Sequence, residues 1–169
     1  MKLVTYLKEE HEQVALLVDG MVYDVDLVHP DIPNTISMCL NYWDELFPVL
    51  QAGELAIGEG HISTRKALSL ESVQLIAPIP FPPSCRDGYA FRQHVASARR
   101  NRNAPMIAEF DQYPVFYFTN HHGIQGPGDI RCMPDHLEKL DFELEVAIVI
   151  GRPGRNILAE GADQYIAGL

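Results

Sequence analysis

Three acidic residues alternate with apolar residues in one short stretch, and this spacing could hold a cation. Asp141, Glu143 and Glu145 are separated by Phe142 and Leu144. In an extended backbone alternate side chains share one face, so neighbouring carboxylates would lie about 7 Å apart at the backbone and their tips could converge on one ion. Burying these charges unpaired would be costly, and a divalent cation would remove that cost. The alternative is that the acids are solvated where a strand emerges from the core.

The element that must position these acids is the apolar run that follows them. Residues 146–150 are apolar and mostly β-branched, with no polar alternation, which is typical of a strand covered on both faces. We therefore predict a strand near the centre of a sheet, with its acids directed toward a covered region.

The composition fits a globular protein with an acidic balance. Of the 169 residues, 47% are apolar and 21% charged, and 13 Lys and Arg against 23 Asp and Glu give a net charge of −10. This balance argues against a general binder of nucleic acid or of anionic membranes. The chain begins without the apolar core of a signal peptide and has no run near the roughly 20 residues of a membrane span, so we expect a soluble cytoplasmic protein. The widely spaced Cys39, Cys85 and Cys132 are expected to be reduced thiols.

The first half of the chain has the pattern of a small β-rich module with one helix. Asp19 and Gly20 lie between two apolar runs, which is a strong hairpin signal. The spacing of apolar residues predicts strands over residues 3–7, 14–28 and 69–76 and a helix over residues 35–51. We find no motif in this module that could carry chemistry.

A proline-rich stretch then predicts a boundary. Residues 76–83 contain four prolines, which is too many for regular structure and suits a stiff linker. We therefore expect a small N-terminal β-rich domain at residues 1–79 and a second domain at residues 80–169.

A helix is expected after this boundary. Ser84 could cap a helix that runs to about Arg102. On that helix Asp87 and His94 are seven residues apart, which is two turns, and would share a face. Taken alone, Asp87 has the simpler role of stabilising a first helical turn, and His94 that of a hydrogen-bonded core residue.

A short strand and a loop follow the helix. Residues 114–118 are predicted to form a buried strand. In the loop beyond it, His121 and His122 are adjacent, and adjacent residues rarely converge on one zinc ion, so we interpret them as solvated. The Gly-Pro-Gly sequence at residues 126–128 lacks the spacing and the lysine of a phosphate-binding loop.

Four segments occur in a specific order. They are Asp-Gly-Tyr-Ala-Phe-Arg-Gln-His at residues 87–94, Tyr-Pro-Val-Phe-Tyr at 113–117, Asp-Phe-Glu-Leu-Glu at 141–145 and Val-Ile-Gly at 149–151. Together they resemble the fumarylacetoacetate hydrolase family, most sharply over residues 80–169. The resemblance implies an α+β, β-rich fold, in which a small N-terminal β domain precedes a mixed β-roll that is incomplete here.

The resemblance also implies a metal site and a general base. Glu143 and Glu145 match two carboxylate ligands of a Mg²⁺ or Ca²⁺ ion, and Asp87 matches a third. All-oxygen ligation is what such hard cations prefer. His94 falls on the position of the histidine that activates water in the hydrolase.

Three further residues are implied to bind the substrate. Tyr89 and Tyr117 match positions that touch it. The arginine that steadies the substrate lies about nine residues after the histidine, where this chain has Asn103, so its neighbour Arg102 is the candidate.

By this resemblance the reaction is metal-dependent hydrolysis of a C–C bond in a 1,3-dicarbonyl or acylpyruvate substrate such as fumarylacetoacetate, an intermediate of aromatic amino acid catabolism. The metal would polarise a carbonyl and His94 would take a proton from water. One alternative is an enzyme with the same metal site that decarboxylates, hydrates or tautomerises a 2-oxo acid. Another is a non-catalytic module that binds a cation. The expected partners are the small-molecule substrate and a second copy in a homodimer, with no nucleic acid and no membrane.

The resemblance also concerns the length of the chain. In the family, sequence beyond the position of Leu169 carries a further Asp ligand, a catalytic lysine and much of the substrate pocket. We therefore expect the chain to be the N-terminal portion of a family member, inactive alone and with unpaired strand edges.

Overall fold

The protein divides into two compact units. The computed structural model describes residues 1–169. Unit 1 combines Met1–Pro80 with Gln125–Leu169, and unit 2 is Phe81–Ile124. The fold is a mixed α+β arrangement rich in sheet. The expected division into domains at residues 1–79 and 80–169 stays a prediction.

A five-stranded antiparallel sheet forms the body of unit 1. Its strands lie in the order β4-β3-β2-β1-β5. Asp19 and Gly20 join β2 to β3 with φ values of 50° and 77°, the left-handed turn geometry that matches the twist of a hairpin. The hairpin prediction is therefore confirmed. The bounds of the strands are Leu3–Lys8 for β1, His11–Val18 for β2, Met21–Asp24 for β3, Leu68–Ser69 for β4 and Gln74–Leu75 for β5.

Two of the predicted strands are shorter than expected because 3-10 turns interrupt them. The strand predicted to reach residue 28 ends at Asp24 and continues as the turn η1, Val25–Leu27. The strand predicted over residues 69–76 is split into β4 and β5 by η3, Leu70–Ser72. A further turn, η2, spans Thr64–Lys66 before β4.

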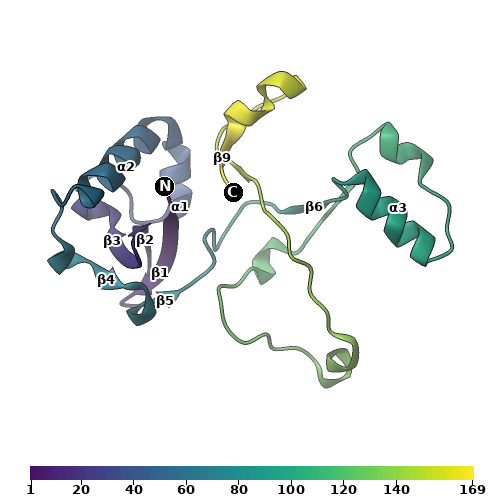
Figure 1. The fold of residues 1–169 in the computed structure, drawn as a ribbon, viewed down its shortest axis with the longest axis horizontal. Helices are drawn as coiled ribbons and strands as arrows, with labels where there is room; N and C mark the ends of the chain where they lie inside the picture. The colour runs from purple at the N-terminus through teal and green to yellow at the C-terminus, as the bar shows by residue number, and fades with distance from the viewer. The chain divides into compact units, whose positions relative to one another are not determined.

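Two helices follow β3, and they lie beside the sheet (Figure 1). They are α1, Ile36–Asn41, and α2, Trp43–Gly58, so the predicted helix over residues 35–51 is confirmed in type, with a break at Tyr42. Helix α1 begins where the Thr35 hydroxyl accepts the N–H of Met38, and the Ile36 N–H donates to Glu12 Oε1 at 2.7 Å. The capping carboxylate comes from β2, so it ties the helix to the sheet.

The main core of unit 1 lies between these helices and the sheet. A buried cluster joins β2 and η1 to the two helices, and its members have at most 6% of their surface exposed. Its residues are Val14, Val25, Ile32, Ile36, Cys39 and Leu50.

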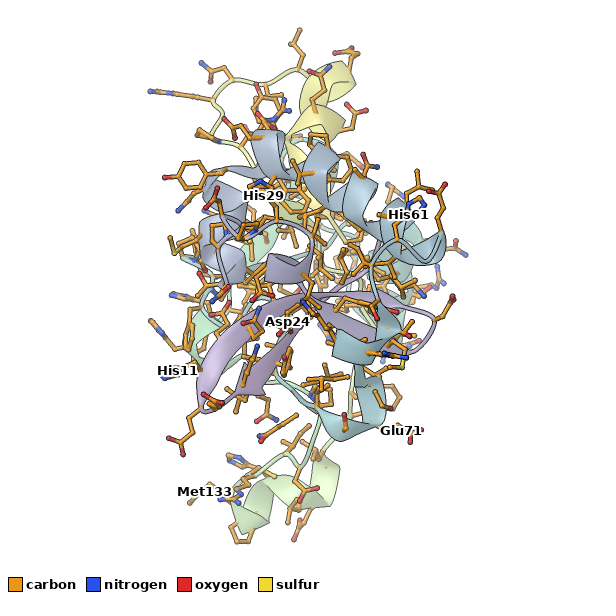
Figure 2. All side chains as sticks on the ribbon, turned by 90° about the vertical axis from the view of Figure 1, so that its left-hand side faces the viewer. His11, Asp24, His29, His61, Glu71 and Met133 are labelled. Carbon is orange, nitrogen blue, oxygen red and sulfur yellow. The ribbon has the colours of Figure 1, made fainter.

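A polar network lies on the sheet itself. The Tyr6 hydroxyl donates to Asp24 Oδ1 at 2.7 Å, and Lys8 Nζ lies 2.6 Å from Asp24 Oδ2. Figure 2 marks Asp24 among the strands. The pKa of Tyr6 is raised, chiefly by burial and then by the hydrogen bond to Asp24. Asp24 thus joins β3 to β1 across the intervening β2.

The C-terminal part of unit 1 forms a short hairpin. Strand β8, Val149–Ile150, pairs with β9, Ile166–Gly168. Next to β8, Arg152 forms an ion pair with Asp44 of α2 at 2.6 Å. The 3-10 turns η6, Pro134–Lys139, and η7, Ala159–Tyr165, belong to the same region.

The expected central strand over residues 146–150 is largely absent. Only two of its residues pair, and Leu144, Val146 and Ile148 are 95%, 75% and 58% exposed. The reason is that β9 is the one strand that pairs with β8, and residues 141–148 belong to no strand. The prediction that this run is covered on both faces is wrong.

The Gly-Pro-Gly sequence at residues 126–128 has a packing role at its first glycine. A Cβ on Gly126 would lie 2.6 Å from the Cα of Ile76 and 2.9 Å from the backbone nitrogen of Ala77. Two backbone segments therefore pass in close contact where the chain leaves unit 1 and where it returns, and only glycine fits there.

Unit 2 consists of a strand pair, one helix and two 3-10 turns. Strand β6, Arg86–Gly88, pairs with β7, Phe116–Phe118. Helix α3 is Arg92–Asn101, η4 is Ala108–Asp111 and η5 is His121–Gly123. Strand β7 is exposed, with Phe118 at 67%, so the prediction of a buried strand over residues 114–118 is wrong in its burial.

Helix α3 begins later than the sequence predicts. The expected start at Ser84 is wrong because residues 86–88 pair with β7, and the N-cap is Phe91. The end is close to the prediction. Asn103, with φ of 53°, donates its N–H to the carbonyl of Arg100, and the Ala104 N–H donates to that of Arg99, which is the Schellman arrangement. None of the helices combines the length and the apolar character that crossing a membrane requires.

Candidate functional site

The strand pair of unit 2 places Asp87 directly opposite Tyr117. The two residues are register partners, and the Tyr117 hydroxyl donates to Asp87 Oδ2 at 2.6 Å. Asp87 is half-buried. Because strand neighbours in register have side chains on the same face, this contact follows from the pairing itself. Two residues predicted for the site are thereby brought together.

Tyr89 links this strand pair to His94. Its N–H donates to the carbonyl of Val115 at 2.9 Å, which extends the β6–β7 pairing by one residue. Its ring meets the His94 ring edge-on, with centroids 6.3 Å apart and planes at 65°. His94 is in the first turn of α3 and is exposed. The prediction that Asp87 and His94 share a helical face is wrong, and Tyr89 connects the two elements instead.

Arg102 lies at the other end of α3. It is the C-cap residue, eight positions beyond His94, which corresponds to roughly 12 Å along a helix. Its side chain is exposed, and its N–H donates to the carbonyl of Arg99 within the last turn of the helix. The structure does not group Arg102 with those residues, and its substrate-binding role stays a prediction.

Glu143 and Glu145 lie close together in unit 1. A carboxylate oxygen of one is within 4.8 Å of a carboxylate oxygen of the other, and both side chains are exposed. The neighbouring Asp141 is turned to its own backbone, where Oδ1 accepts the N–H of Phe142 at 2.9 Å. Two carboxylates at this separation repel each other and offer hard oxygen donors, so their chemistry fits a Mg²⁺ or Ca²⁺ ion. Asp87 belongs to unit 2, and its part as a third ligand stays a proposal.

An open pocket of about 500 Å³ lies beside Tyr89 in unit 2. Residues 88–90 and 110–116 line it. On its rim, Asp111 receives two hydrogen bonds from Arg92, from Nε at 2.8 Å and from Nη2 at 3.1 Å. These bonds lower the pKa of the Asp111 carboxyl and raise that of the Arg92 guanidinium. The pair joins η4 to the first residue of α3.

Sequence reasoning did not identify this pocket or this ion pair. Arg92 and Asp111 are 19 residues apart and belong to no common motif. Several of the lining residues belong to the motifs at residues 87–94 and 113–117, but their meeting in one pocket depends on how the chain between α3 and β7 turns back toward β6. No motif or spacing in the sequence indicates that Arg92 and Asp111 form an ion pair.

Comparison with known proteins agrees with the motifs. The family model described as Fumarylacetoacetate (FAA) hydrolase C-terminal matches residues 84–169. A fumarylacetoacetate hydrolase domain-containing protein 2 homolog of Dictyostelium discoideum is 23% identical over 176 residues, which covers 99% of this chain and 52% of that protein.

Two vertebrate proteins are also similar. The mitochondrial oxaloacetate tautomerase fahd2 of Xenopus laevis is 30% identical over 139 residues, and the human mitochondrial oxaloacetate tautomerase FAHD2B is 29% identical over 139 residues. Each alignment covers 76% of this chain and 41% of the relative. The chain thus spans about half the length of the curated relatives it matches. Because the family model covers half of the chain and includes Asp87, His94, Glu143 and Glu145, the chain belongs to the fumarylacetoacetate hydrolase family of enzymes.

Proposed function

We propose that this protein takes part in proton transfer at a 2-oxo acid, and that the reaction is tautomerisation between the keto and enol forms. The observation that carries the proposal is the contact between His94 and Tyr89, next to the strand that holds Asp87. The similarity to vertebrate proteins named oxaloacetate tautomerases supports this reaction type.

In this proposal His94 moves the proton. An imidazole readily gains and loses a proton near neutral pH, and His94 is exposed and accessible to a ligand. In the keto-to-enol direction the C–H bond beside the 2-oxo group breaks, and an O–H bond forms on the carbonyl oxygen. The proton is conserved overall, so the reaction needs no co-reactant. Tyr89 orients the imidazole through the edge-on ring contact.

Glu143, Glu145 and Asp87 would hold a Mg²⁺ or Ca²⁺ ion in this proposal. The close oxygens of the two glutamates support their part. The family motif supports that of Asp87. When bound, such a cation polarises a carbonyl group as a Lewis acid. The Tyr117 hydroxyl, hydrogen-bonded to Asp87, would fix the orientation of that carboxylate.

Hydrolysis of a C–C bond in a 1,3-dicarbonyl or acylpyruvate substrate is the second candidate. One observation favours it, the match of His94 to the histidine that activates water in the hydrolase. In that reaction His94 would remove a proton from water rather than from carbon, and the attacked C–C bond would break. The two candidates therefore share the residue but differ in the group that it deprotonates.

The variant His94→Ala tests the proton-transfer role. The full-length enzyme proposed to contain this chain is assayed for loss of the enol absorbance of oxaloacetate and, separately, for cleavage of an acylpyruvate. We expect His94→Ala to lose at least about a hundredfold in rate, the contribution usual for a positioned acid–base group. His136→Ala, an exposed histidine in η6, is the matched control and should keep full rate. Unchanged rates in His94→Ala would remove this residue from the mechanism.

The metal site is tested by binding rather than by turnover. Calorimetric titration of the protein with Mg²⁺ and with Ca²⁺ should show binding, and Glu143→Gln should weaken it by about tenfold or more, as loss of a ligating group does. Glu138→Gln, which removes an exposed acid from η6, is the control. If Glu143→Gln and Glu138→Gln bind the cations with equal affinity, the assignment of Glu143 as a metal ligand is refuted.

The remaining features are proposals for the whole protein. We propose that the full-length enzyme is a cytoplasmic homodimer with a mixed β-roll, and that its partners are small 2-oxo acid or dicarbonyl molecules. Several of the vertebrate relatives are named as mitochondrial proteins. Fractionation of cells that express a tagged protein would decide between the two locations.

A further inference from the structure

A further pocket lies in unit 1, between the start of helix α2 and the C-terminal hairpin. Its volume is about 230 Å³. Its wall consists of Trp43, Asp44 and Phe47 from α2, Gly151 and Arg152 after β8, and residues 163–167, which include the start of β9. None of the residues of the candidate site is among them, so a ligand bound here would be independent of the proposed reaction.

The hairpin side of this pocket packs directly against the tryptophan. The Gly151 N–H donates to the carbonyl of Tyr165 at 2.8 Å, which extends the pairing of β8 with β9. A Cβ on Gly151 would lie 3.4 Å from Trp43 Cδ1 and 2.8 Å from the Cβ of Ala167. The glycine backbone therefore approaches the indole closely, and the two walls of the pocket are in contact.

Three aromatic rings supply much of the apolar surface of the pocket. Trp43 and Phe47 lie one helical turn apart on α2, with ring centroids 5.5 Å apart and planes at 45°. Tyr165 contributes the third ring from the hairpin side, and it is half-buried, as is Trp43. The face of an aromatic ring carries negative potential and attracts cations, and indole does so most strongly.

The charged side chains of the wall are two carboxylates and one guanidinium. Arg152 donates from Nε to Asp44 Oδ1 at 2.7 Å, and its Nη2 lies 2.6 Å from the same oxygen. The guanidinium is therefore already paired. Asp163, on the hairpin side, is exposed, and its carboxylate has no hydrogen-bond or ion-pair partner in the protein. The wall thus carries one more negative than positive charge, and this excess charge is available to a ligand.

We infer that this pocket binds a small organic cation, an ammonium group with apolar substituents. The rings of Trp43, Phe47 and Tyr165 contact the substituents and the cation, and the carboxylate of Asp163 balances the charge. An anion would meet two carboxylates and a guanidinium that is already paired. A bare metal ion would gain little from the rings, because hard cations prefer a set of oxygen ligands.

The fluorescence of the protein tests this inference directly, because Trp43 is the only tryptophan of the chain. The probes are choline and its neutral isostere, in which a tert-butyl group replaces the trimethylammonium group. Choline chloride should change the emission in a saturable way relative to the same concentration of sodium chloride. The isostere should bind at least about fivefold more weakly, because it keeps the shape but lacks the charge. Equal affinities for the two probes would overturn the inference.

Two variants of the full chain locate the charge that the ligand meets. Asp163→Asn should weaken the binding of choline by about fivefold, the effect of one exposed ion pair. Glu45→Gln removes an exposed acid of α2 that does not line the pocket, and it should leave the affinity within about twofold. An unchanged affinity in Asp163→Asn, or no saturable response to choline up to about 20 mM, would overturn the inference. Neither outcome would affect the tests of His94 and Glu143.

Discussion

Gly53 in α2 offers a sharp test of how the helix packs. A methyl group added there would lie 2.7 Å from Val28 Cγ2 and 3.1 Å from Val28 Cβ. In an unconstrained helix, Gly→Ala stabilises by about 1 kcal/mol, whereas overpacking a filled site costs about 1–3 kcal/mol. Val28 is β-branched and its χ1 is stiff, so it cannot easily rotate away. We therefore expect Gly53→Ala to lower the free energy of unfolding by about 1 kcal/mol.

Gly58 at the end of the same helix is the matched control. A Cβ at that position meets nothing within 4 Å, so Gly58→Ala should raise the free energy of unfolding by up to about 1 kcal/mol. Urea denaturation followed by circular dichroism measures both variants, and the two should differ by about 2 kcal/mol. Adding Val28→Ala to Gly53→Ala should recover part of the loss, as a positive coupling in a double-mutant cycle. Equal stabilisation by both glycine substitutions would refute the close contact between Gly53 of α2 and Val28, the C-cap residue of η1.

Two further predictions concern buried groups. Burial and the hydrogen bond to Asp24 raise the pKa of Tyr6 above its unfolded value of about 10, so its contribution to stability is complete below pH 10 and is lost as the pH rises further. Tyr6→Phe should cost about 1 kcal/mol at pH 7 and should reduce the alkaline loss in urea titrations, and an unchanged alkaline slope would contradict this account. Burial also raises the pKa of the Cys39 thiol to about 11, so a thiol reagent at pH 8 should label the partly exposed Cys85 and Cys132 and reach Cys39 only on unfolding. Rapid labelling of all three thiols in the folded protein would contradict the burial of Cys39.

The parts of the fold that depend on local sequence were predictable. The hairpin at Asp19 and Gly20 follows from left-handed turn chemistry, and the helix after Thr35 follows from its cap and apolar spacing. The parts that depend on pairing between distant residues were not. Ser84 is a suitable helix cap, but residues 86–88 pair with a strand 30 residues away, and no local propensity reports that choice.

In the candidate site, too, contacts between neighbouring residues were predictable and contacts between distant residues were not. The closeness of Glu143 and Glu145 was expected from the alternation of side chains along an extended backbone, and their carboxylate oxygens lie within 4.8 Å of each other although these residues form no strand. The contact between Tyr89 and His94 requires the turn between β6 and α3, and the Arg92–Asp111 pair requires the return of a loop after the helix. Motif similarity identified Glu143, Glu145, Tyr89 and His94 by position, but only the three-dimensional arrangement shows that Asp111 pairs with Arg92.

The alternation of acidic and apolar side chains along residues 140–150 has a consequence for insertions and deletions. Glu143 lies between Phe142 and Leu144, which are 84% and 95% exposed, so single substitutions there have few neighbours to disturb. Removing or adding one residue between Glu145 and Val149 is different, because it changes the register of the acidic residues relative to strand β8 and places apolar side chains where the carboxylates were. An exposed extended segment is usually where length varies most freely. This segment should instead accept changes of residue type and reject changes of length.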